Sequence, residues 1–573
     1  MGERKTYIIN IDGMRADYFN ANGHQGCLTP TLVQLAKLGV QFTDCKDVMP
    51  ANTGTNHTSI LTSTHAGSHG ILGVGGYYQG LDFSHPRHSQ SYGIPKATMY
   101  THCHLQVPTF FNIIKKNNPN LITAFITSKT WLGSILPDAD SDITIYPGNT
   151  IETSGEHQPN PRYVTSPEGY TLGGPAHFDD NEILPRFYVP KKAESGKEPP
   201  GTISTGLLGI DADTLPSDQW SIKQSITCIE KENPDFMYIV LMNMDLAGHL
   251  YGAFTSNEKT NCDNLSQLRN PAAAKDQLFL TDQQIKRFID CLKENKLLNK
   301  ARIIITSDHG MNTMKSPLSR IYWKNIAYWL LNKLKPLKNP PGQSTIRFPE
   351  MERLDIDIRR ILAKHRIQMK ASQGTWHKRY NPKGAYDWCV SDGVALAYIY
   401  NVKPTMQKKI KKILLSYERK ENGKIEHPIW KVLTEEDMND AINEYTGLPF
   451  CLGRGSFNDD YDCIWPSVIV FPKPHYVVPF YNDQLQLGMT SLMLSVFLPN
   501  FIDVNFPPGS HGTYEEQNVP FIFVSPNESI RNNGTIIEKQ VSVLDIIPTI
   551  NILNEWPYQQ TFEGKPLFPI LRK

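Results

Sequence analysis

The segment with the clearest chemical signal is residues 305–311, whose sequence is ITSDHGM. An apolar stretch at residues 302–305 leads into Asp308 and His309, and a glycine follows them. A buried strand that ends in this way delivers two side chains to the carboxyl edge of a sheet, where open α/β folds place their active sites. Carboxylate and imidazole groups are ligands of zinc and similar divalent ions, so the segment predicts part of a metal site.

Four further segments carry side chains of a similar kind next to expected element boundaries. They are Asp12 in NIDGMR, Thr53 in PANTGTNH, Asp245 and His249 in NMDLAGH, and His511 in PGSHG. Three carboxylates and three imidazoles suit two divalent ions about 4 Å apart, which together clamp the attacking and leaving oxygens of a phosphoryl displacement. Thr53 begins an expected helix, so its hydroxyl and nearby backbone N–H groups would face a bound anion. A bound metal ion would make this hydroxyl a usable nucleophile.

Each of these residues has an ordinary structural explanation when it is taken alone. An aspartate after a strand, such as Asp12, is usually a turn or cap residue. His249 alone would more often be a hydrogen-bonded structural histidine, and Thr53 alone is typical of a helix N-cap. The metal-site hypothesis therefore depends on all five segments occurring together, each at an element boundary.

Alternating strands and helices must position these residues. Turn signals and hydrophobic periodicity predict strands at 6–11, 40–42, 121–126, 236–241, 302–305 and 520–524. They predict helices at 29–38, 53–61, 108–116, 221–232, 278–295 and 543–553. This alternation indicates an α/β fold, with a mostly parallel central sheet covered by helices on both faces.

Two long stretches interrupt the alternation and are expected to form a cap. Residues 131–215 are irregular and rich in Pro, Gly and polar residues, as lids and substrate walls often are. Residues 314–476 contain expected helices at 321–334 and 356–364 and a strand-like run at 395–400. The predicted organisation is a core made of 1–130, 216–313 and 477–573, a lid at 131–215 and a cap at 314–476.

The composition excludes some partners and classes. Hydrophobic residues make up 40% of the 573 residues and charged residues 20%, which is ordinary for a globular protein. The formal net charge of +1 does not favour a nucleic-acid duplex or an anionic membrane as the partner. The nine cysteines are scattered and show no CxxC pair, which argues against a disulfide framework, although Cys451 and Cys463 could pair.

The chain shows no targeting or membrane segment. No apolar run approaches the roughly 18 residues that a membrane span needs. Residues 1–5 leave no room for a signal peptide before the first expected strand. We therefore expect a cytoplasmic protein by default, although a secreted protein without its leader would look the same. Oligomeric state is not visible in the sequence.

The motifs DG, T, NH, DxxxH, DHGM and SHG, in this order, resemble those of the alkaline phosphatase superfamily, specifically its type I phosphodiesterase/nucleotide pyrophosphatase branch. The resemblance covers roughly residues 6–129, 221–313 and 506–567 and does not reach the two insertions. It implies two divalent metal ions, with Zn2+ as the expected identity. One would be held by Asp245, His249 and His511, and the other by Asp12, Thr53, Asp308 and His309.

The resemblance also implies a reaction in two in-line steps. Thr53 would attack phosphorus and form a phosphothreonine intermediate, which water activated on the metal ion beside Asp245 would then displace. The charge of the metal ions would supply most of the acceleration. The expected enzyme is a phosphodiesterase or nucleotide pyrophosphatase, and the expected partner is a small phosphorylated substrate such as a nucleotide.

Two features depart from the diesterase pattern. Family members often carry an asparagine in H-G-I-x-x-N that donates to a phosphate oxygen, but here residues 69–73 are followed by Val74. Lys129, in ITSKTW, stands where some relatives that cleave monoesters or phosphonates use a lysine on the substrate oxyanion. If Lys129 reaches the phosphate, a full charge offsets the missing amide and favours a more negative substrate. The alternative is a solvated lysine after a strand.

The neighbours of Thr53 receive lesser roles. Asn56 is placed in the catalytic set with Thr53 and Lys129 because it could orient the start of the helix. His57 is expected to pack beneath the helix. The Gly-rich run at 75–80 lacks the spacing of a P-loop or dinucleotide site and is interpreted as a flexible wall beside the nucleophile. Tyr77 or Tyr78 is the candidate for stacking on a base.

Other functions compete with the phosphodiesterase hypothesis. A phosphomonoesterase or phosphonate hydrolase would use the same metal site together with Lys129. A sulfatase is disfavoured because the C/S-x-P-x-R pattern is absent around residues 52–57, and a phosphomutase would more often use serine. A catalytically silent binding protein of the same fold is the non-enzyme alternative, and the intact ligand set and nucleophile argue against it.

Overall fold

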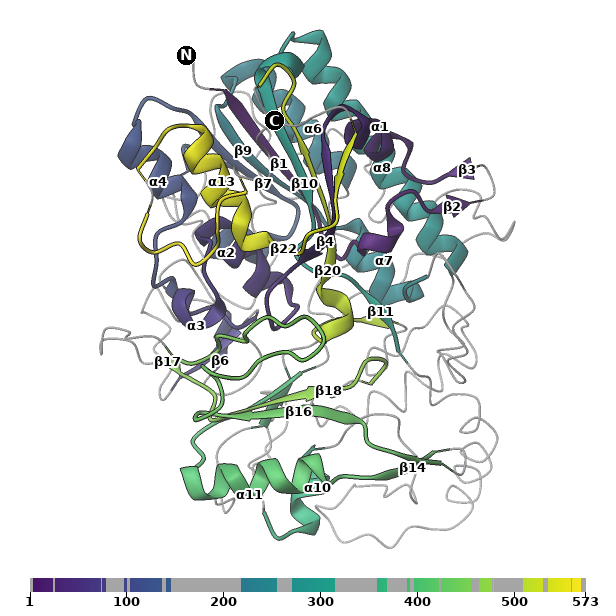
Figure 1. The fold of residues 1–573 in the computed structure, drawn as a ribbon, viewed down its shortest axis with the longest axis vertical. Coiled ribbons are helices and arrows are strands. Elements are labelled where there is room, and N and C mark those ends of the chain that lie inside the picture. Colours follow the sequence, from purple (N-terminus) through teal and green to yellow (C-terminus); the bar gives the residue numbers. More distant parts are fainter. Residues whose placement is uncertain are drawn as a thin grey trace, which may run out of the picture.

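The main body of the protein is a nine-stranded sheet with helices on both faces (Figure 1). The computed structural model describes residues 4–23, 26–73, 75–78, 97–99, 104–136, 141–145, 218–254, 271–314, 358–367, 389–391, 396–421, 424–454, 463–476, 478, 509–528, 534–557 and 559–567. The strand order is β21-β4-β20-β10-β1-β9-β7-β8, and β22 also pairs with β4. The strands are β1 (Lys5–Ile11), β4 (Val40–Lys46), β7 (Thr123–Thr127), β8 (Ile143–Ile145), β9 (Phe236–Leu241), β10 (Ala301–Thr306), β20 (Asn518–Val524), β21 (Thr535–Ile537) and β22 (Val541–Ser542).

The centre of this sheet is parallel. β1 pairs in parallel with β10 on one side and with β9 on the other, and β7 and β8 continue the parallel set. β20 runs antiparallel to both β10 and β4. Alternate side chains of β1 enter opposite cores, Tyr7 and Ile9 on one face and Ile8 on the other, as the two-residue period of a strand requires.

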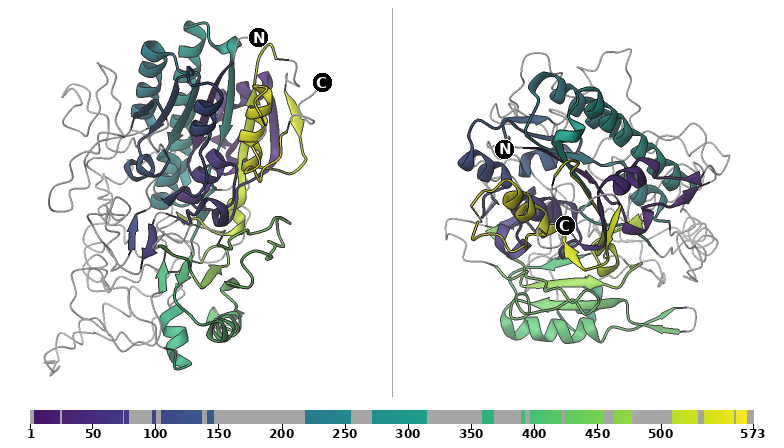
Figure 2. Two further views of the ribbon diagram at one scale, coloured as in Figure 1. Left: turned by 90° about the vertical axis from the view of Figure 1, so that its left-hand side faces the viewer. Right: turned by 45° about the horizontal axis from the view of Figure 1, so that its top comes forward.

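Helices bury both faces of the sheet, as the views in Figure 2 also show. One core contains residues of α1 (Pro30–Leu38), α6 (Asp218–Glu232), α7 (Asn243–Tyr251) and α8 (Pro271–Glu294). The opposite core contains residues of α2 (Thr53–Thr62), α4 (Phe110–Asn117), α5 (Thr130–Ile135) and α13 (Ile546–Leu553). The predicted α/β class, with a mostly parallel sheet between two helical layers, is confirmed.

Element boundaries differ from the prediction where the hydrophobic pattern is weak. α8 begins at Pro271 rather than at residue 278 because its first turns are rich in alanine, which buries without marking a strong apolar stripe. β4 continues to Lys46 rather than ending at residue 42, since the polar residues 43 and 44 face outward from the strand. α7 was not predicted; its nine residues directly follow β9.

A second, antiparallel sheet lies beyond the carboxyl ends of the central strands (Figures 1 and 2). Its strands are β12 (Cys389–Ser391), β13 (Ala397–Ile399), β18 (Val468–Pro472) and β16 (Ile429–Thr434), and α10 (Ile358–Lys364) and α11 (Pro404–Leu415) share a core with it. The expected helix at 321–334 and most of the expected lid at 131–215 lie outside the described residues. The proposed domain boundaries therefore stay predictions.

The opposite face of this second sheet packs on the segments around α2. Tyr398 and Phe471 share a hydrophobic cluster with Met49, Ala66 and Leu72 of the core. The Tyr398 hydroxyl donates to the Leu72 carbonyl oxygen at 2.8 Å. The second sheet is therefore joined to the segments on either side of the expected nucleophile.

Two smaller expectations need correction. The run interpreted as a flexible wall forms strand β5 (Gly75–Tyr78), which pairs with β6 (Ala97–Met99) and with β17 (Cys463–Ile464). Cys451 carries a free thiol, so it forms no bridge with Cys463. Among the described helices, none combines the length and the apolar character that a membrane span requires.

Candidate active site

The carboxyl edge of the central sheet brings the predicted ligands together in two groups. Asp245, His249 and His511 form one group, and Asp12, Asp308 and His309 form the other. Within each group, one ligand atom from every residue lies within 4.8 Å of the others. Asp12 follows β1, Asp308 and His309 follow β10, and Asp245 and His249 lie four residues apart on α7, so one helix face carries both.

Backbone contacts hold these segments against one another. The Asp12 N–H donates to the Leu241 carbonyl oxygen at 2.9 Å. Gly13 adopts φ +77°, and a Cβ at this position would lie only 2.6 Å from the Asp245 Cα. Glycine is therefore required where the Asp12 turn passes the start of α7. The Ser307 hydroxyl donates to the Ile11 carbonyl oxygen at 2.6 Å, which fixes the ends of β1 and β10 to each other.

The three imidazoles share one hydrogen-bonding pattern. The Nδ1–H of His249 donates to the Gly509 carbonyl oxygen at 3.0 Å, and that of His511 donates to the Ala51 carbonyl oxygen at 2.8 Å. His309 donates in the same way to the Gly310 carbonyl oxygen at 2.7 Å. With Nδ1 protonated in each ring, Nε2 offers its lone pair, and ligating histidines are typically held in this way.

The carboxylates carry unmatched charge. Asp12 Oδ1, Asp245 Oδ1 and Asp308 Oδ2 are buried and have no hydrogen-bond partner among the described residues. A buried carboxylate oxygen without a donor is costly unless a cation neutralises it. Burial raises the pKa of Asp308 to about 8, and the neighbouring Asp12 carboxylate adds to this rise. Carboxylate oxygens and imidazole Nε2 atoms are a donor set that fits divalent metal ions.

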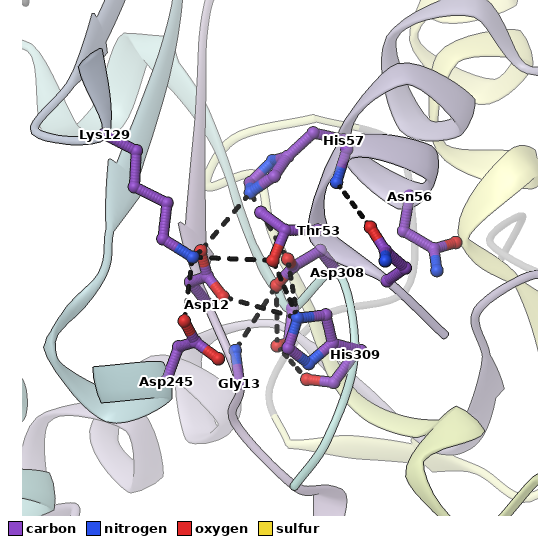
Figure 3. Close-up of polar contacts among 12 residues, drawn as sticks. Asp12, Gly13, Thr53, Asn56, His57, Lys129, Asp245, Asp308 and His309 are labelled. Atoms are coloured by element: carbon purple, nitrogen blue, oxygen red, sulfur yellow. Dashed lines mark hydrogen bonds and ion pairs between the residues drawn. The ribbon is translucent and has the colours of Figure 1, made fainter. Parts of the chain in front are cut away.

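Lys129 lies between the two ligand groups (Figure 3). It follows β7 at the start of α5 and is only 6% exposed. Its Nζ is 2.5 Å from Asp12 Oδ2 and 2.8 Å from Asp245 Oδ2. Burial lowers the pKa of Lys129, but the carboxylates of Asp12, Asp245 and Asp308 outweigh this effect and hold it above its usual value. Lys129 is therefore a buried ammonium in the site and is not a solvated residue.

Thr53 occupies the position expected of a nucleophile. It is the first residue of α2, and the Asn52 side chain caps the helix by accepting from the Gly54 N–H at 3.1 Å. The Thr53 hydroxyl oxygen lies 3.0 Å from His309 Nε2 and 3.4 Å from Lys129 Nζ (Figure 3). The hydroxyl thus lies beside a ligand nitrogen on one side and a fixed positive charge on the other.

The remaining predicted residues lie apart from this cluster or outside the described side chains. Asn56 points away from it (Figure 3) and bonds the preceding loop, donating to the Val48 and Pro50 carbonyl oxygens at 3.0 and 3.2 Å. Its placement in the catalytic set is corrected to a positioning role, because the helix turns its side chain toward the backbone of this loop. The side chains of Tyr77 and Tyr78, and all of Val74, lie outside the described residues.

Sequence reasoning gave His57 no role at the site, yet its ring faces the ligands. His57 is fully buried, and its Nε2 lies 3.4 Å from Asp308 Oδ2. The signal was present in the spacing, since residues four apart on a helix lie on the same face and Thr53 is one turn away.

The comparisons with known proteins agree with this geometry. A model of the type I phosphodiesterase/nucleotide pyrophosphatase family matches residues 6–387, two thirds of the chain. The chain belongs to this family. The family is metal-dependent, in keeping with the two ligand groups. His511 lies beyond the matched residues, and the structure alone brings it to the site.

Relatives of this phosphodiesterase family are distant in sequence. Human ectonucleotide pyrophosphatase/phosphodiesterase family member 1 is 22% identical over 306 residues, which are 53% of this chain and 23% of that protein. The match thus spans less than a quarter of the human relative.

Solved structures of similar fold include murine ectonucleotide pyrophosphatase/phosphodiesterase 5, with a TM-score of 0.52, 13% identity and 98% of each chain covered. Alkaline phosphatase PafA gives a TM-score of 0.57 at 13% identity, with 99% of each chain covered. At these identities the likeness concerns the fold alone.

Proposed function

We propose that this chain is a metal-dependent hydrolase of phosphoric esters that acts through Thr53, with phosphodiesters and nucleotide pyrophosphates as its substrate class. The observation that carries the proposal is the position of the buried Thr53 hydroxyl. It lies 3.0 Å from Nε2 of His309, a member of one ligand group, and 3.4 Å from Lys129 Nζ. A hydroxyl with no chemical task would not need such surroundings.

The start of α2 also suits the phosphoryl group. Helix N-terminal N–H groups attract anions, so a phosphate in front of Thr53 meets partial positive charge from the backbone. The Lys129 ammonium adds a full charge on the side of β7. Both groups are fixed before substrate binds, because Asn52 caps the helix and Lys129 is paired with two carboxylates. Such preorganised charge stabilises a transition state without further rearrangement.

The reaction proceeds in two displacements. The Thr53 oxygen forms a bond to phosphorus as the bond to the leaving oxygen breaks, and the leaving group departs as an alcohol or a phosphate. Water then attacks phosphorus from the side that the leaving group has vacated, opposite the Thr53 oxygen. The bond between phosphorus and the Thr53 oxygen breaks, the phosphorylated product is released, and the threonine oxygen takes up a proton from the attacking water. The capped start of α2 fixes the position of the Thr53 oxygen before the first displacement.

Two metal ions, with Zn2+ as the expected identity, fit the two ligand groups. Asp245, His249 and His511 would hold one, and Asp12, Asp308, His309 and Thr53 would hold the other. When bound, the ions would neutralise phosphate charge and lower the pKa of the threonine hydroxyl and of water. Their charge would also neutralise the buried oxygens of Asp12, Asp245 and Asp308 that have no hydrogen-bond partner among the described residues.

A nucleotide is the substrate that the relatives favour. The family description names nucleotide pyrophosphatases. An inactive variant of the murine family member 5 has been solved in complex with AMP. We therefore expect a nucleoside monophosphate to be the group that is transferred to Thr53.

A second candidate function is hydrolysis of phosphomonoesters or phosphonates. It is favoured by one observation, the approach of the Lys129 ammonium to Thr53. A dianionic terminal phosphoryl group would gain more from this charge than a monoanionic diester.

One experiment separates these functions. The metal-loaded protein is assayed side by side on p-nitrophenyl phosphate and on a p-nitrophenyl nucleotide diester, with Thr53→Ala as the inactive reference. Faster turnover of the diester is the expected result, and a large preference for the monoester would establish the second function instead. If the wild type binds about two metal ions and AMP but turns over neither compound, the chain is a silent binding protein and the proposal is wrong.

A further inference from the structure

A buried histidine contacts the candidate metal site from the helix that carries the nucleophile. His57 follows Thr53 by four residues, which is one turn of α2. Its Nε2 lies 3.4 Å from Asp308 Oδ2 and 3.8 Å from Asp12 Oδ2 (Figure 3). On the other side of the ring, Nδ1 lies 2.8 Å from the Tyr238 hydroxyl.

These neighbours determine where the ring carries its hydrogen. With Asp308 and Asp12 ionised, as carboxylates that ligate a metal ion are, the oxygens that face Nε2 accept and do not donate, so Nε2 carries the hydrogen. Nδ1 then accepts from the Tyr238 hydroxyl. Among the described residues, neither His57 Nε2 nor Asp308 Oδ2 has a full hydrogen bond, and the 3.4 Å approach between them is a looser polar contact. The imidazole edge therefore faces the same oxygen of Asp308 that lies 3.3 Å from His309 Nε2.

Tyr238 is itself firmly held. It lies on β9 directly opposite Phe125 of β7, and the two rings stack with centroids 5.8 Å apart. The His57 and Tyr238 rings meet edge to face at 77°. Helix α2 fixes His57 from one side and the central sheet fixes it from the other, so its N–H direction is set by rigid elements.

We propose that His57 is a positioning residue that orients the Asp308 carboxylate for metal binding and keeps that ligand in register with Thr53. A donor beside a ligating carboxylate limits rotation of the carboxylate and fixes which oxygen faces the ion. Because Thr53 and His57 lie on one helix turn, the same contact sets the distance between the nucleophile and the ion. This role rests on the proposed function, since it requires a metal ion at Asp12, Asp308 and His309.

The test measures metal affinity rather than turnover. Metal-free full-length protein is titrated with Zn2+ against a chromophoric chelator, and the two binding steps are resolved for each variant. His57→Ala should weaken one step by roughly 10- to 100-fold, the usual effect of losing a partner of a metal ligand. That step should be the one that Asp308→Asn removes, and the other step should not change. His57→Gln, which keeps a donor near the position of Nε2, should restore most of the affinity.

A second buried histidine under the same helix provides the matched control. His69 is fully buried, and its Nε2 lies 2.9 Å from the Ser59 hydroxyl of α2, but the structure places no ligand carboxylate against it. His69→Gln should therefore leave both zinc steps within about threefold of the wild type. Tyr238→Phe removes the hydroxyl that donates to His57 Nδ1 and keeps the aromatic ring of residue 238. It should weaken the same zinc step as His57→Ala, by a smaller factor.

The outcomes separate the inference from the proposed function. If His57→Ala weakens neither step, or weakens both equally, the positioning role is wrong while the metal site stands. If His69→Gln lowers affinity as much as His57→Ala, the effect is one of helix packing, and the role is again wrong. If His57→Ala does not fold, Tyr238→Phe takes its place. One zinc step weakened in Tyr238→Phe but close to the wild type in His57→Gln supports the positioning role, and a Tyr238→Phe variant with both steps unchanged contradicts it. A folded wild type that binds no metal would overturn both the proposed function and this inference.

Discussion

Replacing Lys129 with methionine tests whether the buried ammonium acts on the substrate. Methionine keeps most of the length and apolar volume of the side chain and removes the charge. In the structure Nζ pairs with Asp12 and Asp245 and lies 3.4 Å from the Thr53 hydroxyl oxygen. A phosphoryl group attacked by that oxygen has its phosphorus at most about 6 Å from Nζ, since reacting atoms approach to about 3 Å, and a nonbridging oxygen turned toward Lys129 lies about 5 Å from Nζ or nearer.

The size of the effect follows from the charge of the substrate. Two unit charges about 5 Å apart interact by about 3 kcal/mol at an effective dielectric constant of about 20. A monoester carries one more negative charge than a diester at neutral pH. Lys129→Met should therefore lower kcat/KM for the monoester more than for the diester. The monoester value divided by the diester value should fall by about a hundredfold.

The assay compares p-nitrophenyl phosphate with the p-nitrophenyl nucleotide diester in wild type and variant. The ratio removes any change in metal content or folded fraction, because both substrates meet the same enzyme. Lys115→Met is the matched control, since Lys115 also pairs with an aspartate, Asp142, but lies outside the site. A ratio that stays within about threefold of the wild type would refute the reasoning. It would mean that the ammonium stays on Asp12 and Asp245 throughout the reaction.

Three other perturbations test the site and its support. Thr53→Ala should abolish turnover of both substrates and leave zinc content nearly unchanged by metal analysis; residual activity near the wild-type level would reject Thr53 as the nucleophile. Removing metal with a chelator should lower the free energy of unfolding by about 4 kcal/mol for each ion, or about 8 kcal/mol for two, relative to protein in zinc at a thousand times Kd, measured by urea unfolding, because the ions bind the native chain; equal stability would contradict a bound metal. Burial lowers the pKa of His69 from 6.5 to about 3, so the unfolded chain binds a proton that the native one refuses between these values, and stability is lost as pH falls through this window. Between pH 7 and pH 5 the wild type should lose about 2 kcal/mol more than His69→Asn, and parallel losses would show that His69 does not resist protonation.

Local pattern was sufficient to predict the core of the fold. The strand at 236–241 and the helix beginning at Thr53 follow from apolar runs and from an N-cap, and the structure has both at these positions. The start of α8 could not be predicted in this way, because Ala273 and Ala274 are buried by contact with other helices and carry little periodic signal. The antiparallel pairing of β20 with β10 could not be predicted locally either, because the paired residues are more than 200 positions apart in the chain.

The candidate site likewise has features that the sequence predicts and features that depend on tertiary contacts. The residue types of Asp12, Asp308 and His309 predicted a ligand group, and the structure brings them together. What the sequence could not show is the hydrogen bonding around them. The Ala51 carbonyl oxygen that fixes His511 is 460 residues away in the chain, and the Tyr238 hydroxyl that fixes His57 is 181 residues away. Such partners are set by tertiary packing, so a ligand can be predicted from spacing while its orientation cannot.

The second sheet reaches the nucleophile through a short chain of contacts, and this bears on where selectivity arises. Tyr398 of β13 bonds the Leu72 carbonyl oxygen, and the next residue, Gly73, lies against α2. The approach is so close that a Cβ on Gly54, the neighbour of Thr53, would lie 2.1 Å from the Gly73 carbonyl oxygen. Glycine at position 54 thus lets a segment held by the insertion touch the start of the nucleophile helix. A change in the insertion that moves Leu72 is therefore expected to move Gly73 against the start of α2, which couples the second sheet to the position of Thr53.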